Sequence, residues 1–135
     1  MKPHQVMGYT LLNTTAITAI TSTRIYHGLR PVGTAVPSIN YYEIGGARRS
    51  NGIESVVYSI NCRASTASAA RDLGRLVVDV FAGSSGTGVY GYQNSSFEIA
   101  RASLETDGGL IPETDDSLFN CPIDIRVVYP ISTVS

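Results

Sequence analysis

Two hydrophobic periodicities run along this chain, and they separate predicted helices from predicted strands. Between residues 6 and 20, apolar side chains recur every three or four positions, which predicts a helix with one apolar stripe. The same spacing predicts a second helix that is capped by Ser65 or Thr66 and ends at Gly83. The first stripe consists of Val6, Tyr9, Leu12, Ala16 and Ile20, and the second of Ala69, Ala70, Leu73, Leu76, Val77, Val80 and Phe81.

Strict alternation of apolar and polar residues predicts strands elsewhere. In the last strand, Ile123, Ile125, Val127 and Tyr129 face one way, and Pro130 ends it. An earlier strand places Val56, Tyr58, Ile60 and Cys62 on one face and Ser55, Ser59, Asn61 and Arg63 on the other, with Val57 as the exception. One buried face and one solvent-facing face are typical of an antiparallel sheet covered on one side. Further strands are predicted over residues 24–26, 38–44 and 97–104.

Proline and glycine mark the connections between these elements. Pro31, Gly33 and Pro37 predict a loop, because fixed φ angles and missing amide donors prevent regular structure there. A polar link over residues 45–52 joins two strands into a hairpin, and a glycine- and serine-rich link covers residues 84–91. The chain therefore predicts an α+β fold, with a four- to five-stranded, mainly antiparallel sheet and two helices packed on one face.

Composition limits the possible classes of protein. The 135 residues predict one domain, and 43% apolar with 16% charged residues excludes a disordered chain. No apolar run approaches the roughly 18–20 residues that a membrane span requires, and the N-terminus lacks a secretory signal. The net charge of −1 argues against sequence-specific DNA binding through a basic surface. We therefore expect a soluble protein of the cytosol.

Charge is distributed unevenly between the two halves of the chain. Residues 1–63 carry six basic and two acidic groups, whereas residues 64–135 carry four basic and nine acidic groups. Such a chain could be a dipolar monomer. It could also be a subunit whose basic hairpin meets a neighbour's acidic loop, a head-to-tail contact that closes into a ring if the rotation per subunit divides the circle. The residues in question are Arg48, Arg49, Glu113, Asp115 and Asp116.

The sequence offers no recognisable catalytic, cofactor or metal site. Cys62 and Cys121 are predicted to be small buried thiols, and neither has a neighbouring base to activate it. The glycine-rich run over residues 83–88 follows a helix instead of preceding one, so it is not a phosphate loop. Acidic residues between 105 and 116 could bind Ca²⁺, but their spacing matches no EF-hand, and a solvated acidic loop is the simpler interpretation. We expect no enzyme activity.

A group of short motifs lies between residues 18 and 45. They read Thr18-Ala19-Ile20, Arg24-Ile25-Tyr26, Pro31-Val32-Gly33-Thr34-Ala35-Val36-Pro37 and Ile39-Asn40-Tyr41-Tyr42. In this order, they resemble the helix, Arg-Ile-Tyr-like strand, Pro-x-Gly-Thr-x-x-Pro loop and tyrosine-containing strand of the tail completion, or tail terminator, proteins of long-tailed phages. The remainder of the chain is similar to that family only in the order of its elements.

The resemblance implies a virion structural protein of the phage tail and neck, assembled in the host cytoplasm. Members of the family form a ring, usually a homo-hexamer, at the head-proximal end of the tail tube. The ring ends polymerisation of the tail tube protein and offers a docking surface for the head–tail connector, while DNA passes through the lumen without being held. The contact segments that we expect are the loop of Pro31, Gly33 and Pro37, the hairpin of Arg48 and Arg49, and the acidic segment of residues 107–116.

Two other functions remain open from the sequence. The chain could be a head–tail adaptor or minor capsid protein of the same neck. It could also be a small ligand-binding or metal-dependent α+β domain that uses the acidic segment as a metal or general-base site.

Overall fold

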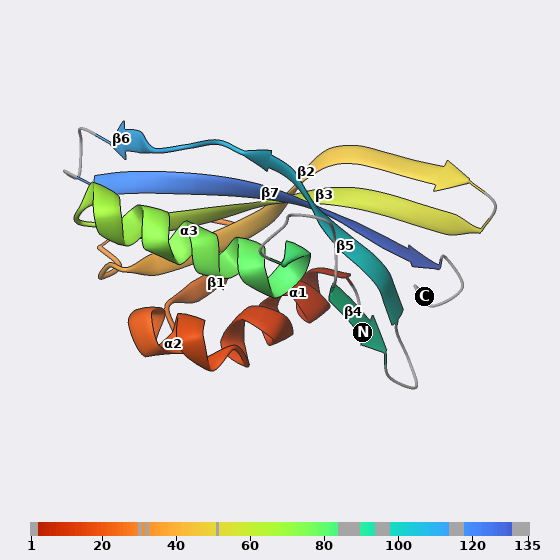
Figure 1. The fold of residues 1–135 in the computed structure, drawn as a ribbon, viewed down its shortest axis with the longest axis horizontal. Helices are drawn as coiled ribbons and strands as arrows, with labels where there is room; N and C mark the ends of the chain where they lie inside the picture. Colours follow the sequence, from red (N-terminus) through yellow and green to blue (C-terminus); the bar gives the residue numbers. More distant parts are fainter. Residues whose placement is uncertain are drawn as a thin grey trace.

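The computed structural model describes residues 3–29, 31, 33–50, 52–83, 90–93, 98–113 and 118–130. Within these residues lie three helices and seven strands (Figure 1). In chain order they are α1 (Pro3–Leu12), α2 (Thr15–Thr21), β1 (Ile25–His27), β2 (Ser38–Ser50), β3 (Ile53–Ala64), α3 (Ala67–Ala82), β4 (Tyr90–Gln93), β5 (Glu98–Asp107), β6 (Ile111–Glu113) and β7 (Leu118–Pro130).

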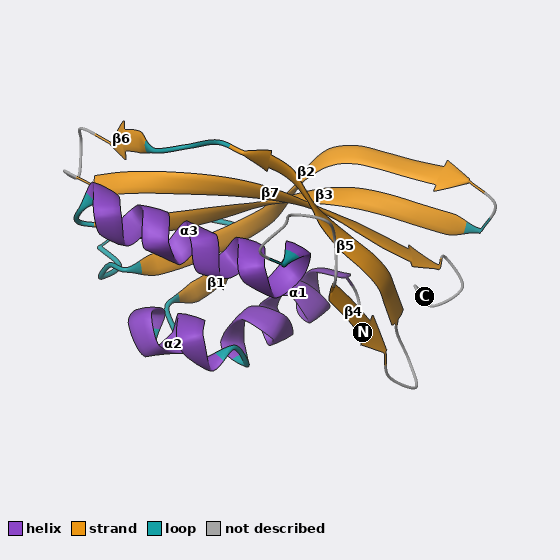
Figure 2. Cartoon of the chain, in the orientation of Figure 1, coloured by secondary structure: helices purple, strands orange, loops and turns teal. Residues whose placement is uncertain are grey.

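The strands form one sheet in the order β1-β2-β3-β7-β5-β4, and β6 pairs with β7 beyond the end of β5. Only the β1–β2 pair among the described strands is parallel. The helices lie on one side of the sheet (Figure 2). The predicted α+β class and mainly antiparallel sheet are therefore confirmed. The strand count is larger than predicted because β4 and β6, with four and three residues, are too short to give a readable alternation.

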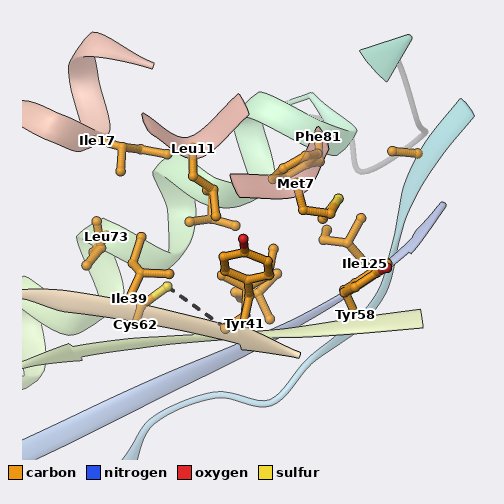
Figure 3. Close-up of a cluster of buried hydrophobic side chains, with 14 of the residues drawn as sticks. Met7, Leu11, Ile17, Ile39, Tyr41, Tyr58, Cys62, Leu73, Phe81 and Ile125 are labelled. Carbon is orange, nitrogen blue, oxygen red and sulfur yellow. Dashed lines mark hydrogen bonds between the residues drawn. The ribbon is translucent and has the colours of Figure 1, made fainter. Parts of the chain in front are cut away.

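The core lies between the helices and the nearer face of the sheet. Met7 and Leu11 of α1, Ile17 of α2, and Leu73 and Phe81 of α3 point toward this face (Figure 3). They pack against fully or almost fully buried strand residues, namely Ile39, Tyr41, Val56, Tyr58, Ile60, Cys62, Cys121, Ile123, Ile125, Val127 and Tyr129. The alternation that predicted the buried faces of β3 and β7 is thus confirmed.

The α3 helix also agrees with its prediction. Thr66 caps its N-terminus, because the Thr66 side chain accepts a hydrogen bond from the Ala69 amide. Gly83 follows the last turn with a φ of 70°, a conformation that favours glycine.

None of the helices within the described residues is long and apolar enough to span a membrane.

The N-terminal helix departs from its prediction in two ways. It is broken into α1 and α2, because the side chains of Asn13 and Thr14 donate hydrogen bonds to the carbonyls of Tyr9 and Thr10 and end the first helix. The predicted stripe is also wrong except at Val6, which is buried. Tyr9, Leu12, Ala16 and Ile20 are exposed, and the other buried residues are Met7, Gly8, Thr10, Leu11, Ile17 and Thr21.

The predicted polar link over residues 45–52 is mostly strand. β2 continues to Ser50 and β3 begins at Ile53, so the two strands form a long hairpin with a tight turn. The register shifts on both sides of Gly45, whose φ is 98°. Because glycine tolerates a positive φ, β2 continues past an irregularity at Gly45, in a segment that was expected to end the strand. The predicted link over residues 84–91 likewise ends early, because Tyr90 and Gly91 belong to β4.

Candidate assembly interface

The outer part of the β2–β3 hairpin extends beyond the helices (Figure 1). We call this part, residues 42–50 and 52–55, the arm. β1 pairs with β2 only as far as Tyr41, so β2 is an edge strand throughout the arm among the described residues. Ile44 on this edge has 47% of its surface exposed, and Tyr42 has 38%. Arg48 and Arg49 stand in β2 opposite Ser55 and Glu54.

A second exposed edge is formed by β6, which pairs with the beginning of β7, whereas the arm lies near the end of β7. We call it the β6 end, residues 110–113. Leu110 and Ile111 are 41% and 47% exposed, and Glu113 is the last residue of β6. Glu113 is held in place by Arg63, whose Nε lies 2.7 Å from Glu113 Oε1. Arg63 also donates to Asn40 Oδ1, and Asn40 Nδ2 donates to the Gly28 carbonyl, so one polar chain connects β6 to the end of β1.

The basic and acidic segments singled out in the sequence occupy opposite ends of the molecule. Arg49 lies beside Glu54, which pairs with Tyr129 near the end of β7, whereas Glu113 pairs with Leu118 at its beginning. At ~3.3 Å per residue, these two points on β7 are about 36 Å apart. The two segments therefore cannot meet within one chain. Asp115 and Asp116 lie outside the described residues.

The loop between β1 and β2 holds the remaining predicted contact residues. Pro31 and Gly33 are exposed, and Gly33 has a φ of 78°, which favours glycine. Pro37 is partly buried, and its carbonyl accepts a hydrogen bond from Arg24 Nε at 2.9 Å. Because Pro37 precedes Ser38, which is paired with Arg63, it lies at the same end of the sheet as Glu113. The structure therefore places Pro37 and Glu113 at one end, and Arg48 and Arg49 at the other.

The face of the sheet opposite the helices was predicted to be solvent-facing, and in its centre this is wrong. Ser59 and Asn61 are only 6% and 5% exposed. The register explains this result, since Ser59 lies between Tyr42 and Asp124, and larger neighbours shield a small side chain on a central strand. Buried Asn61 also accepts a hydrogen bond from Asn120 Nδ2 at 2.9 Å.

The described acidic residues of this segment are exposed or half-exposed, as predicted, but they lie in strands and not in a loop. Glu105 and Asp107 belong to β5, and each is paired with an arginine. Arg126 contacts both carboxylate oxygens of Glu105 at 3.1 Å and donates to Ser55 Oγ at 2.9 Å, which connects β5, β7 and β3. Arg71 Nη1 lies 2.7 Å from Asp107 Oδ1, and this hydrogen bond lowers the pKa of the carboxyl. Glu105, Asp107 and Glu113 are thus neutralised within the chain.

The two cysteines are placed for packing. Cys62 and Cys121 are buried, unbridged and directly paired across β3 and β7, as the prediction of buried thiols required. Burial raises the pKa of both thiols and so disfavours the reactive thiolate. Within the described ranges, His, Cys, Asp and Glu form no group of three or more suited to hold a metal ion.

Sequence reasoning missed the exposed apolar residues at the two ends. Leu110 and Ile111 lie inside the predicted contact segment of residues 107–116 but were not singled out, and Ile44 immediately precedes the predicted link over residues 45–52. A signal for the arm was present in Asn51-Gly52, since Asn-Gly is the strongest short-range indicator of a two-residue hairpin turn. Gly52 has a φ of 79°, in keeping with such a turn.

Comparison with known proteins gives a likeness of fold. No family model matches the sequence, and no curated protein matches it either. Among solved structures, a chain of the virion of a native gene transfer agent (GTA) particle is similar to this one, with a TM-score of 0.61. The match covers 91% of each chain at 14% sequence identity. The two chains therefore share an arrangement of helices and strands over nearly their whole length.

Proposed function

We propose that this chain is a virion structural protein that forms a ring, with six subunits as the expected number, at the head-proximal end of a phage tail tube. One observation carries the proposal, namely the fold that it shares with a virion chain over 91% of both lengths. The motifs between residues 18 and 45 support the finer assignment to a tail terminator. The ring would end polymerisation of the tube and present a surface to the head connector.

The distribution of charge supports a ring of head-to-tail subunits. The basic pair Arg48 and Arg49 lies at the end of the sheet opposite Glu113. Glu113 is itself paired with Arg63, and the acidic residues Asp115 and Asp116 follow it along the chain. Different surfaces on the two sides of one subunit give a heterologous contact, which closes into a ring or continues as a filament. A closed ring fits a protein that must stop a polymer from growing.

The pairing of charges also suits a channel through which DNA must move. The arginines Arg63 and Arg126 on the helix-free face are each bound to a carboxylate, which leaves them less available to phosphate. A near-neutral wall neither concentrates nor holds a polyanion. The protein would thus act by shape, without catalysis and without a cofactor.

Tails purified apart from heads provide the test. If the chain is a terminator, it is present on such tails, and an antibody against it labels only the head-proximal end in electron micrographs. A head–tail adaptor would be absent from these tails and present on heads. A chain absent from both would contradict the proposed virion role.

A further inference from the structure

We propose that Cys62 and Cys121 form a disulfide bond across β3 and β7 when the reduced protein meets a small-molecule disulfide such as glutathione disulfide, and that Cys121 reacts first. The proposal concerns the fold of the single chain and does not depend on the ring. Under the proposed function, the pair would stay reduced during assembly in the reducing cytoplasm and become oxidised after the virion is released.

The first argument is the position of the two cysteines in the sheet. Cys62 and Cys121 are directly opposed in the antiparallel pair of β3 and β7, whose register shows no shift. Both side chains belong to the core beneath the helices, so they point to the same face. Directly opposed residues in such a pair have Cα atoms roughly 4.5–5.5 Å apart. Disulfides join Cα atoms about 4.4–6.8 Å apart, so the bond can form without a change of register.

The second argument is that neither sulfur has a strong partner. The Cys62 thiol donates to the Ile60 carbonyl at 4.0 Å, and Cys121 Sγ accepts from Arg71 Nη1 at 3.6 Å. Thiols are weak donors and weak acceptors, so little is lost when either sulfur leaves its present contact. Each sulfur can therefore turn toward the other.

The third argument is that the two cysteines are covered differently. Cys62 lies between two paired strands, with Ile39 of β2 on one side and Cys121 on the other. On the far side of Cys121, β7 changes its partner, because it pairs with β5 up to Ile123 and with β6 from Asn120. Among the described strands, none pairs with Cys121 on that side. A local opening therefore reaches Cys121 before it reaches Cys62.

The charge beside Cys121 also favours its reaction. Arg71, whose side chain is one third exposed, is held by Asp107 Oδ1 at 2.7 Å and contacts the Cys121 sulfur. Burial raises the pKa of Cys121, and Arg71 opposes this rise. The thiolate is the form that attacks a disulfide, and a guanidinium beside it stabilises that form. Arg71 thus acts as a positioning residue for the first step.

The reaction consists of two thiol–disulfide exchanges. Cys121 gives its proton to water, and its thiolate attacks one sulfur of glutathione disulfide, which breaks that S–S bond and releases one glutathione thiolate. Cys62 then loses its proton, attacks the Cys121 sulfur of the mixed disulfide and releases the second glutathione. Two protein thiols are oxidised, and one glutathione disulfide is reduced to two thiols. Because both cysteines are buried, each step waits for a local opening, and the reaction should be slow.

The folded wild-type protein, incubated with excess glutathione disulfide at neutral pH, provides the test. Its intact mass should fall by two hydrogen atoms, with no glutathione retained. Trypsin cleaves after lysine and arginine, so a digest without reductant should contain residues 50–63 linked to residues 102–126. The bond closes a loop of roughly sixty residues, and the melting temperature should rise by on the order of 10 °C. The control, Cys62→Ala with Cys121→Ala, should melt at the same temperature with and without oxidant.

Single-cysteine variants test the order of attack, after circular dichroism has shown that they are folded. Cys62→Ala should take up one glutathione several-fold faster than Cys121→Ala. In the Cys62→Ala background, Arg71→Gln should slow this uptake and move its pH profile to higher pH. Arg126→Gln removes a different ion pair to β5 and should do neither. In the wild type, an early quench in acid should trap glutathione on Cys121. Equal rates for the two single-cysteine variants, or glutathione trapped on Cys62, would overturn the proposal.

Three results with the wild type would also overturn it. The first is a stable product that carries two glutathiones, and the second is a dimer of two copies linked through these cysteines. The third is no reaction even a few degrees below the melting temperature, where opening is frequent. A bridged protein that melts no higher than the reduced protein would overturn it as well, since the native register would then not accommodate the bond. None of these results bears on the ring, which the isolated tails test separately.

Discussion

The helix-covered part of the sheet and the arm are built from the same strands, but they differ in what surrounds them. In the covered part, Ile60 and Ile123 pair across β3 and β7 and are fully buried beneath the helices. In the arm, β2 and β3 continue without a helix above them, and Ile44 and Ile53 are about half exposed. The covered part supplies the buried apolar contacts that stabilise the fold, whereas the arm leaves apolar side chains exposed. Four variants test this difference, in order of decreasing effect on the free energy of unfolding.

The largest effect is expected from Ile125→Asp. Ile125 is fully buried beside Tyr58 and Leu104, and a carboxylate there would have no charged partner, which costs several kcal/mol. We expect loss of the cooperative thermal transition measured by circular dichroism. Val128→Asp is the control, because Val128 lies on the same strand but is only partly buried. A folded Ile125→Asp protein with a wild-type transition would contradict this account of the core.

A smaller effect is expected where α3 packs on the sheet. A Cβ at Gly74 would lie 2.6 Å from Cys121 Sγ, so Gly74→Ala forces α3 away from β7. Overpacking of this kind costs about 1–3 kcal/mol, against a gain of up to ~1 kcal/mol in helix propensity. In a Cys121→Ala background the clash is removed, and the same substitution should become neutral or stabilising. Equal effects in both backgrounds, measured by urea unfolding, would rule out the clash.

The ion pair between Arg71 and Asp107 should contribute less. Both side chains are about one third exposed, and such pairs contribute at most about 1 kcal/mol. Because Arg71 lowers the pKa of Asp107 in the folded state, the pair stabilises the fold above the unfolded pKa of roughly 3.9. This contribution is lost as the pH falls through the lowered pKa. Asp107→Asn should therefore be less stable than the wild type at pH 7, and the difference should shrink in acid. A difference that does not depend on pH would contradict this assignment.

No effect on stability is expected from Arg48→Glu combined with Arg49→Glu. Both residues lie in the arm, beyond the helices, so the melting temperature should stay within a few degrees of the wild-type value. Assembly should nevertheless be impaired, because in the proposed ring the reversed charges would repel a neighbour's acidic segment, which includes Asp115 and Asp116. If the variant unfolds, the arm belongs to the stabilising part of the molecule, and the comparison fails.

The covered part could be predicted from the sequence because each of its elements has a clear period. β3, β7 and α3 carry their apolar residues on one face, and Thr66 and Gly83 mark the ends of the helix. The N-terminal helix shows the limit of this approach. Apolar residues occupy so many positions between 6 and 12 that two overlapping stripes fit the spacing, and only packing against the sheet selects Met7 and Leu11 over Tyr9 and Leu12.

The arm and the β6 end could be predicted only in part. Gly45-Gly46 was interpreted as the end of a strand, since glycine weakens strands, but Gly45 is accommodated by a shift in register that local sequence does not encode. The pairing of Arg63 with Glu113 joins residues 50 positions apart, and its partners follow from the order of strands in the sheet. The charge of each segment could be predicted from the sequence. Its position at one end of the sheet could not, because that position depends on the order of the strands.

The most direct measurement is the structure of the assembled particle by electron microscopy, at a resolution that separates subunits. The proposed function predicts a closed ring of copies of this chain at the junction of tail tube and connector. A particle in which this chain forms no closed ring at that junction, or in which it has no place, would contradict it.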